Sequence, residues 1–121
     1  MASSNIAFDR PDGSGGRGAP ERPIDFAHLE RQTMGDKTLE AEVLRMFSRQ
    51  AHSCLAEIGS GETDRIRASA HLLKGAASAV GALRVVRAAA ACEAQPGDAA
   101  ALAEASAAVV EVENFISGLM R

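Results

Sequence analysis

Four residues that could take part in a reaction lie at helical spacing in the sequence: His71, Lys74, Gly75 and Ser78. They stand at i, i+3, i+4 and i+7. A helix with 3.6 residues per turn therefore places them on one face. A neutral imidazole nitrogen is a nucleophile, and an ammonium group one turn away offsets negative charge on a phosphoryl group attached to it. This face is therefore suited to accepting a phosphoryl group.

The other residues of the set fit the same chemistry. Glycine inside a helix costs about 1 kcal/mol relative to alanine, so Gly75 in an alanine-rich chain indicates clearance for a large donor. Ser78 is a candidate hydrogen-bond donor. The alternative is an ordinary surface histidine on a solvated face. No metal-ligand spacing and no catalytic triad involves His71, and His28 and His52, which lack comparable neighbours, are assigned to the surface.

The segment from Glu62 to Val80 is predicted to be the helix that carries this face, with Gly81 as its stop. Leu72, Ala76 and Ala79 form a separate apolar strip on it. A stripe of apolar residues within about 40° of one direction predicts its buried side: Ile66, Ala70, Leu73, Ala77 and Val80.

Four further helices are predicted around it. They are a short helix capped by Asp25 and ending near Gln32, a helix from Asp36 to about Ile58, one over 82–95, and one after Asp98. In the helix that begins at Asp36, the expected buried residues are Leu39, Val43, Met46, Phe47, Ala51, Cys54, Leu55 and Ile58. In the helix over 82–95 they are Leu83, Val86, Ala90 and Ala94. In the last helix they are Leu102, Ala105, Val109, Val112, Ile116 and Leu119.

The fold class predicted from this pattern is all-α. Residues 23–121 would form an antiparallel up-down four-helix bundle with a short N-terminal capping helix. The composition agrees, because 46% of residues are hydrophobic but only 3% are aromatic, which disfavours sheets. Residues 1–22 are rich in Gly and Pro and are predicted to be a flexible tail or a linker.

Charge and composition exclude several classes of protein. A net charge of −3 argues against a nucleic-acid binder, and no apolar run reaches membrane-spanning length. Without a signal-peptide core at the N-terminus, a cytoplasmic protein with reduced, buried Cys54 and Cys92 is expected. Between Arg65 and Ala91 the chain has five basic residues and no acidic one, which predicts a basic region favouring an acidic partner or a phosphoryl group.

The stretch from Ala70 to Ala82 resembles the signature of histidine phosphotransfer (HPt) domains. That signature runs as His, any residue, Leu, Lys, Gly, small residues, an aliphatic and Gly, and its matching positions here are His71, Leu73, Lys74, Gly75, Val80 and Gly81. The resemblance extends over about residues 24–121. It departs from the common pattern at Ala76, where many members have Ser.

The resemblance implies a phosphorelay intermediate without a cofactor of its own. His71 would accept phosphate from a receiver-domain aspartate and pass it to another receiver, with Mg²⁺ supplied by the receiver. Lys74 would steady the phosphoryl group, Gly75 would give access and Ser78 would add a hydrogen bond. The partners implied are receiver domains and a hybrid histidine kinase. The residues expected to contact a partner are Arg67, Leu72, Ala76, Ala79 and Arg84.

Three interpretations stay open at this point. The first is a monomeric phosphoryl carrier without autokinase activity, consistent with Leu72 standing where histidine kinases have an acidic residue. The second is a helical interaction module that binds a receiver or kinase without accepting phosphate. The third is a kinase-type dimerisation bundle that has lost its catalytic partner. Some HPt domains place a side chain from the next helix near the histidine, and Arg84 and Arg87 are the candidates.

Overall fold

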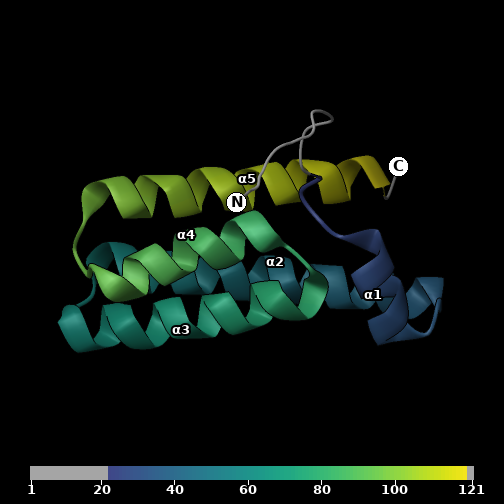
Figure 1. The fold of residues 1–121 in the computed structure, drawn as a ribbon, viewed down its shortest axis with the longest axis horizontal. Helices are drawn as coiled ribbons and strands as arrows, with labels where there is room; N and C mark the ends of the chain where they lie inside the picture. The colour runs from purple at the N-terminus through teal and green to yellow at the C-terminus, as the bar shows by residue number, and fades with distance from the viewer. Residues whose placement is uncertain (1–21, 120–121) are drawn as a thin grey trace, which may run out of the picture.

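In the computed structural model, the described residues are 22–119, and all of their regular structure is helical (Figure 1). The prediction for the N-terminal tail lies outside this range except at Arg22. The helices are α1 (Phe26–Thr33), α2 (Lys37–Ser60), α3 (Thr63–Val80), α4 (Leu83–Ala94) and α5 (Ala99–Leu119). Each begins and ends within about two residues of its predicted position.

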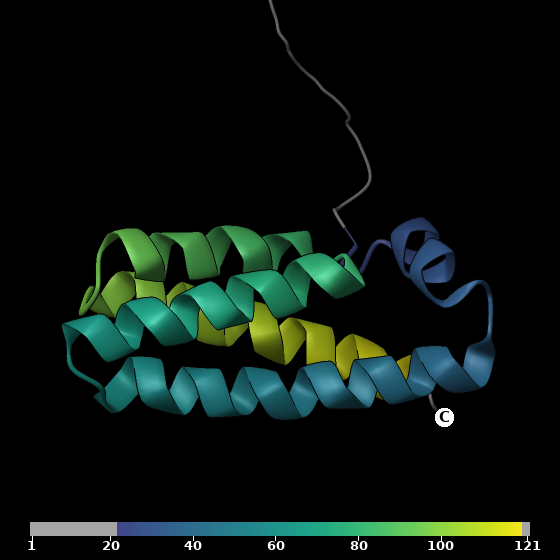
Figure 2. The ribbon, with the colours of Figure 1, turned by 90° about the horizontal axis from the view of Figure 1, so that it is seen from below.

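The four longer helices lie side by side and α1 packs across one end, against α2 and α3 (Figures 1 and 2). The α2–α3 and α4–α5 turns meet at one end of the molecule, and the α3–α4 turn lies toward the other (Figure 1). This all-helical arrangement is compatible with the predicted bundle and its N-terminal capping helix. None of the helices between residues 22 and 119 is long and apolar enough to cross a membrane.

The helix starts follow the predicted capping residues. The Asp25 carboxylate accepts a hydrogen bond from the His28 amide, the Asp36 carboxylate accepts from the amides of Thr38 and Leu39, and the Asp98 carboxylate accepts from the Ala100 amide. These bonds satisfy amide groups that have no partner within the helix.

Gly81 ends α3 in the left-handed conformation, with φ of 76°. Its carbonyl accepts a hydrogen bond of 2.9 Å from the Asp25 amide, so the turn also anchors the start of α1. A Cβ atom at this position would lie 3.1 Å from both Cβ and O of Asp25. Glycine is therefore required here both by the backbone angle and by the close approach of the chain.

The buried side of α3 is the predicted one. All five residues predicted for it are buried: Ile66, Ala70, Leu73, Ala77 and Val80. The prediction for α5 is confirmed at Ala105, Val109, Val112 and Ile116, whereas Leu102 is half-buried and Leu119 is exposed. Cys54 and Cys92 are buried and not joined in a disulfide, as predicted.

The predicted buried face of α2 was partly wrong. Leu39 and Met46 are exposed, and Val43 and Leu55 are only half-buried. Glu40 takes the buried position at the start of the helix, because its carboxylate accepts a 3.2 Å hydrogen bond from the Thr33 hydroxyl at the end of α1. A charged residue is tolerated there because it is hydrogen-bonded.

The predicted face of α4 was wrong by one residue, which is a rotation of about 100°. The buried residues are Val85, Ala88, Ala89 and Cys92, while Leu83 and Ala94 are exposed and Val86 and Ala90 half-buried. Nearly every residue from Val85 to Cys92 is apolar, so the periodicity of hydrophobic residues does not single out one side of this helix.

We predict that Gly81→Ala lowers the free energy of unfolding by about 1–3 kcal/mol, because alanine is strained at this positive φ. Gly75→Ala is the matched control. That glycine is helical and has open space around it, so alanine should raise the free energy by about 0.5–1 kcal/mol. Urea unfolding followed by circular dichroism measures both changes, and a Gly81→Ala protein as stable as the wild type would contradict this account of the turn.

Candidate functional site

Helix α3 presents the predicted face to solvent. The His71 side chain is 69% exposed, and Gly75 and Ser78 are exposed one and two turns further along. A Cβ atom added to Gly75 would meet nothing within 4 Å. Space therefore exists beside the imidazole for a large phosphoryl donor.

The residue that organises this face is Glu93 on α4, which was not among the predicted site residues. One carboxylate oxygen, Oε2, lies 3.0 Å from His71 Nδ1, and the other, Oε1, accepts a 2.8 Å hydrogen bond from Lys74 Nζ. A single side chain of α4 thus holds two side chains of α3. We refer to His71, Lys74 and Glu93 as the α3–α4 cluster.

The pKa of Glu93 is lowered from its ordinary value, chiefly by the hydrogen bond from Lys74; desolvation opposes this lowering, and the hydrogen bond with His71 adds to it. A lowered folded-state pKa means that the cluster contributes stability when the carboxylate is ionised, and that this contribution is lost as the pH falls through the carboxyl range. At neutral pH Glu93 is therefore an anion.

The charge of Glu93 determines the tautomer of His71. An ionised carboxylate only accepts hydrogen bonds, so Nδ1 must carry the proton that lies between them. In the neutral ring the lone pair is then on Nε2, the nitrogen that is not bound to Glu93. The cluster consequently points a nucleophilic nitrogen away from α4.

Lys74 is half-buried and bound to Glu93 in this arrangement. Its ammonium would have to leave Glu93, or share it, to reach a phosphoryl group on His71. Arg67 lies one turn before His71 on the same face and is exposed, and it forms no ion pair with any residue between 22 and 119. It is therefore a second cation available to an incoming anion.

The structure places Arg84 away from this cluster. Its guanidinium pairs with Glu111 at 2.8 Å and with Glu104 at 3.9 Å, both on α5. It is Glu93, not Arg84, that reaches the histidine from the helix after α3. The role predicted for Arg84 in partner binding stays a prediction.

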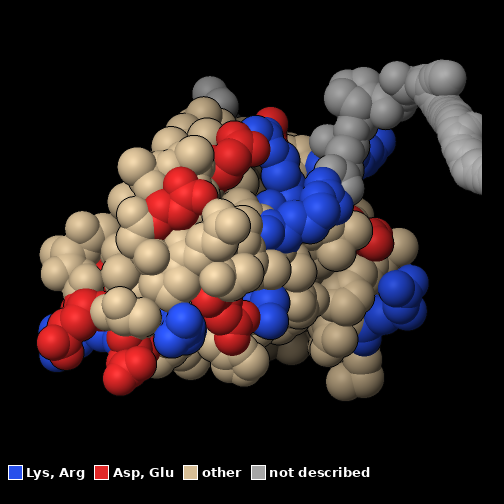
Figure 3. Space-filling model, turned by 60° about the vertical axis from the view of Figure 1, so that its left-hand side comes forward, with Lys and Arg blue, Asp and Glu red and all other residues tan. Residues whose placement is uncertain are grey.

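The predicted basic region is partly neutralised in three dimensions. Arg65 pairs with Glu57 of α2, Lys74 with Glu93, and Arg84 with acidic residues of α5. Figure 3 shows basic and acidic side chains next to one another on one face of the molecule. The count of charges along the chain missed these pairs because the carboxylates come from other helices.

The other two histidines differ from His71. His52 is exposed, as predicted, and its Nε2 pairs with Glu113 of α5. The prediction for His28 was wrong in part, because the residue is half-buried and its Nε2 atom is buried without a hydrogen-bond partner. His71 is thus the histidine whose Nδ1, rather than Nε2, is held by a carboxylate.

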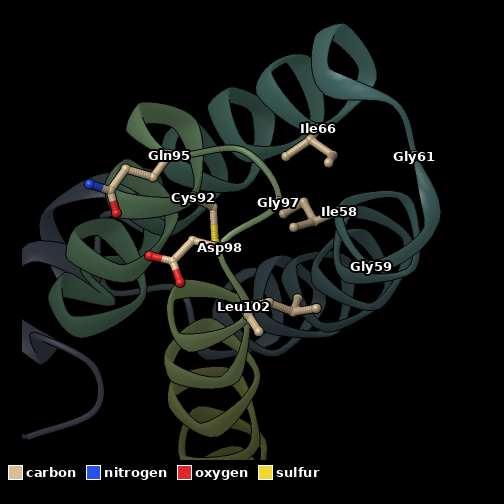
Figure 4. A pocket seen from close by; sticks show the side chains of 10 residues that line it. Ile58, Gly59, Gly61, Ile66, Cys92, Gln95, Gly97, Asp98 and Leu102 are labelled. Atoms are coloured by element: carbon tan, nitrogen blue, oxygen red, sulfur yellow. The ribbon is translucent and has the colours of Figure 1, made fainter.

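A separate pocket of about 300 Å³ lies where the α2–α3 and α4–α5 turns meet (Figure 4). It contains no member of the α3–α4 cluster. Burial, and then the charge of Asp98, raises the pKa of the Cys92 thiol that lines it, so this sulfur is a poor nucleophile at neutral pH. Within the described range no group of three or more His, Cys, Asp and Glu residues is placed to hold a metal ion.

The chain matches a known protein family. The family model described as Hpt domain matches residues 42–120, which include α3, α4 and all three residues of the cluster. No curated protein and no solved structure matches the chain.

We predict that His71 carries its proton on Nδ1 in the unphosphorylated protein. Long-range ¹H–¹⁵N correlation spectra near neutral pH should show this tautomer, and Glu93→Ala should abolish the preference because the only described acceptor at Nδ1 is removed. Glu113→Ala, which frees His52 instead, is the matched control and should leave the His71 signals unchanged. A proton found on Nε2 of His71 in the wild type would contradict the assignment.

Proposed function

Because the chain belongs to the Hpt domain family, whose members transfer phosphoryl groups through histidine in two-component phosphorelays, we propose that it is a phosphorelay intermediate with His71 as the acceptor. The observation that carries the proposal is the exposed imidazole held at Nδ1 by Glu93, with open space over Gly75. This geometry leaves Nε2 as the attacking atom. The donor would be an aspartyl phosphate of a receiver domain.

In the forward step, the Nε2 lone pair attacks phosphorus in line with the bond to the aspartyl oxygen. A nitrogen–phosphorus bond forms as that phosphorus–oxygen bond breaks, and its electron pair stays on the leaving aspartate. No proton has to move, because Nδ1 keeps its own. The same step in reverse passes the phosphoryl group to the aspartate of a second receiver.

Glu93 would act differently before and after transfer. Before transfer, it fixes the tautomer and the orientation of the ring. After transfer, the ring is protonated at Nδ1 and phosphorylated at Nε2, so it carries a positive charge that the adjacent carboxylate stabilises. This dual action resembles that of a carboxylate beside a catalytic histidine, where the partner orients the ring and supports its cationic form.

Lys74 and Arg67 would support the phosphoryl group itself. Both are on the face of α3 that carries His71, Lys74 one turn after it and Arg67 one turn before. Their charges would offset the negative oxygens during and after transfer. Ser78 would contribute a hydrogen bond from two turns further along.

The proposal extends to partners and setting. We take the partners to be receiver domains, one of them in a hybrid histidine kinase, with the Mg²⁺ held by the receiver. The protein would be a cytoplasmic monomer, an antiparallel up-down four-helix bundle and a carrier without autokinase activity. A module that binds a receiver without accepting phosphate is the rival, and chemical analysis of the protein after transfer separates the two.

We predict that incubation with a phosphorylated receiver places acid-labile, alkali-stable phosphate on the wild-type protein, and that His71→Ala abolishes it. His52→Ala is the matched control, since it removes another exposed histidine, and should label normally. Mass spectrometry of the labelled protein checks the result. Label retained in His71→Ala would exclude His71 as the acceptor, and binding without label in the wild type would favour the interaction module.

We further predict that Lys74→Ala slows transfer by about tenfold, because one charge at the phosphoryl group is lost. Lys74→Arg should recover part of the rate. Arg45→Ala removes an exposed cation of α2 that forms no ion pair with a residue of the described range, and it is the control for a general change in charge. Rapid-quench kinetics with a phosphorylated receiver measures all three, and equal rates for Lys74→Ala and wild type would remove Lys74 from the mechanism.

A further inference from the structure

The pocket between the α2–α3 and α4–α5 turns is lined by residues from all four long helices. Its wall is apolar and is formed by Ile58 of α2, Ile66 of α3 and Leu102 of α5. Figure 4 shows these three side chains grouped on one side of Gly97. Ile58 and Ile66 are 5% and 6% exposed, so the two turns screen this wall from bulk solvent.

The polar groups of the pocket lie at its edge. Figure 4 shows the side-chain ends of Gln95 and Asp98 on the side of Gly97 away from the two isoleucines. The Cys92 thiol stays protonated at neutral pH, because burial and then the charge of Asp98 raise its pKa. No lysine or arginine of the described range lines the pocket. An anionic ligand is therefore disfavoured both by loss of its hydration and by the Asp98 carboxylate.

Three of the lining residues have no side chain to fill the space: Gly59, Gly61 and Gly97. A Cβ atom at Gly97 would meet nothing within 4 Å. A Cβ atom at Gly59 would lie 3.7 Å from Leu102 Cδ2, which is an ordinary contact distance. A side chain at position 59 is therefore tolerated by the backbone, and a large one would lie against the apolar wall.

The volume of the pocket limits the size of its ligand. A cavity of about 150 Å³ with apolar walls binds benzene, and this pocket measures about 300 Å³. It therefore has room for a molecule of two fused rings. Sites for small molecules are typically concave and mostly apolar, with a few polar groups that set the orientation. The isoleucines and Asp98 fit those two roles.

We propose that this pocket binds a small uncharged molecule of one or two fused rings that is apolar over most of its surface. Ile58, Ile66 and Leu102 would bury the rings. A ring N–H or a hydroxyl at the edge would donate a hydrogen bond to the Asp98 oxygen that does not accept from the Ala100 amide. The inference does not depend on the proposed function, because the pocket shares no residue with the α3–α4 cluster.

A ligand in this pocket would contact both helices that carry the cluster while leaving His71 accessible. Cys92 immediately precedes Glu93 in α4, and Ile66 precedes His71 by five residues in α3. The pocket also lies outside the strip of α3 predicted to contact a partner, whose members are exposed or half-buried: Leu72, Ala76 and Ala79. Ligand binding and phosphoryl transfer would therefore take place at separate sites on one pair of helices.

The test titrates the full chain with indole and follows glycine amide signals in ¹H–¹⁵N correlation spectra. Gly59, Gly61 and Gly97 line the pocket, whereas Gly35 and Gly75 lie outside it. We expect saturable shifts of the first three signals and none of the other two. Shifts of similar size at all five glycines, or no saturable shift up to the solubility limit of indole, would overturn the proposal.

Two relatives of indole test the charge of the ligand. Indole-3-carboxylate is an anion at neutral pH and should bind about tenfold more weakly than indole, because its charge must lose water beside Asp98. Indole-3-carboxamide is neutral and of similar size, so it controls for the added group and should bind about as well as indole. Equal affinity for the carboxylate and the carboxamide would contradict the assignment of an uncharged ligand.

A variant that fills the pocket locates the site. Gly59→Phe should raise the Kd for indole by about tenfold or more, whereas Ala56→Phe, at an exposed position of α2 outside the pocket, should change it by less than about twofold. Circular dichroism checks that both variants fold. Ala99→Phe, at a lining position of α5, is the second filling variant, with Ala103→Phe, exposed one turn later, as its control. Equal Kd values in a folded filling variant and its control would overturn the proposal.

Discussion

The arrangement of the α3–α4 cluster depends on one carboxylate that bridges two helices. Glu93 of α4 binds Nδ1 of His71 and Nζ of Lys74, both on α3. Its position is set by the α3–α4 turn, where Gly81 adopts a left-handed conformation that lets α4 fold back along α3. The Asp25 amide donates a hydrogen bond to the Gly81 carbonyl and so holds this turn in place. A backbone requirement at Gly81 therefore fixes the geometry of a side-chain cluster some ten residues away.

The same carboxylate connects two requirements that otherwise conflict. A nucleophilic histidine must have a free lone pair, whereas a phosphorylated histidine must bear a positive ring charge. Because Glu93 would accept the hydrogen bond from Nδ1–H in both states, one arrangement would serve both. The ion pair between Glu93 and Lys74 competes with this function, because the ammonium that lowers the pKa of Glu93 is also the cation that the phosphoryl group would attract. Lys74 would therefore pair with Glu93 before transfer and with the phosphoryl group after it.

Much of the fold could be predicted because α3 is strongly amphipathic and three aspartates cap helices where the sequence indicates. The buried faces of α2 and α4 were harder, since Glu40 is buried through a partner on α1 and α4 is apolar almost all round. Glu93 was missed because it comes from α4, and the periodicity of α3 does not indicate which residue of another helix lies beside His71. His71 stands ten residues before Gly81 and Glu93 twelve after it, so a helical hairpin about this glycine brings them level, and that signal is present in the sequence.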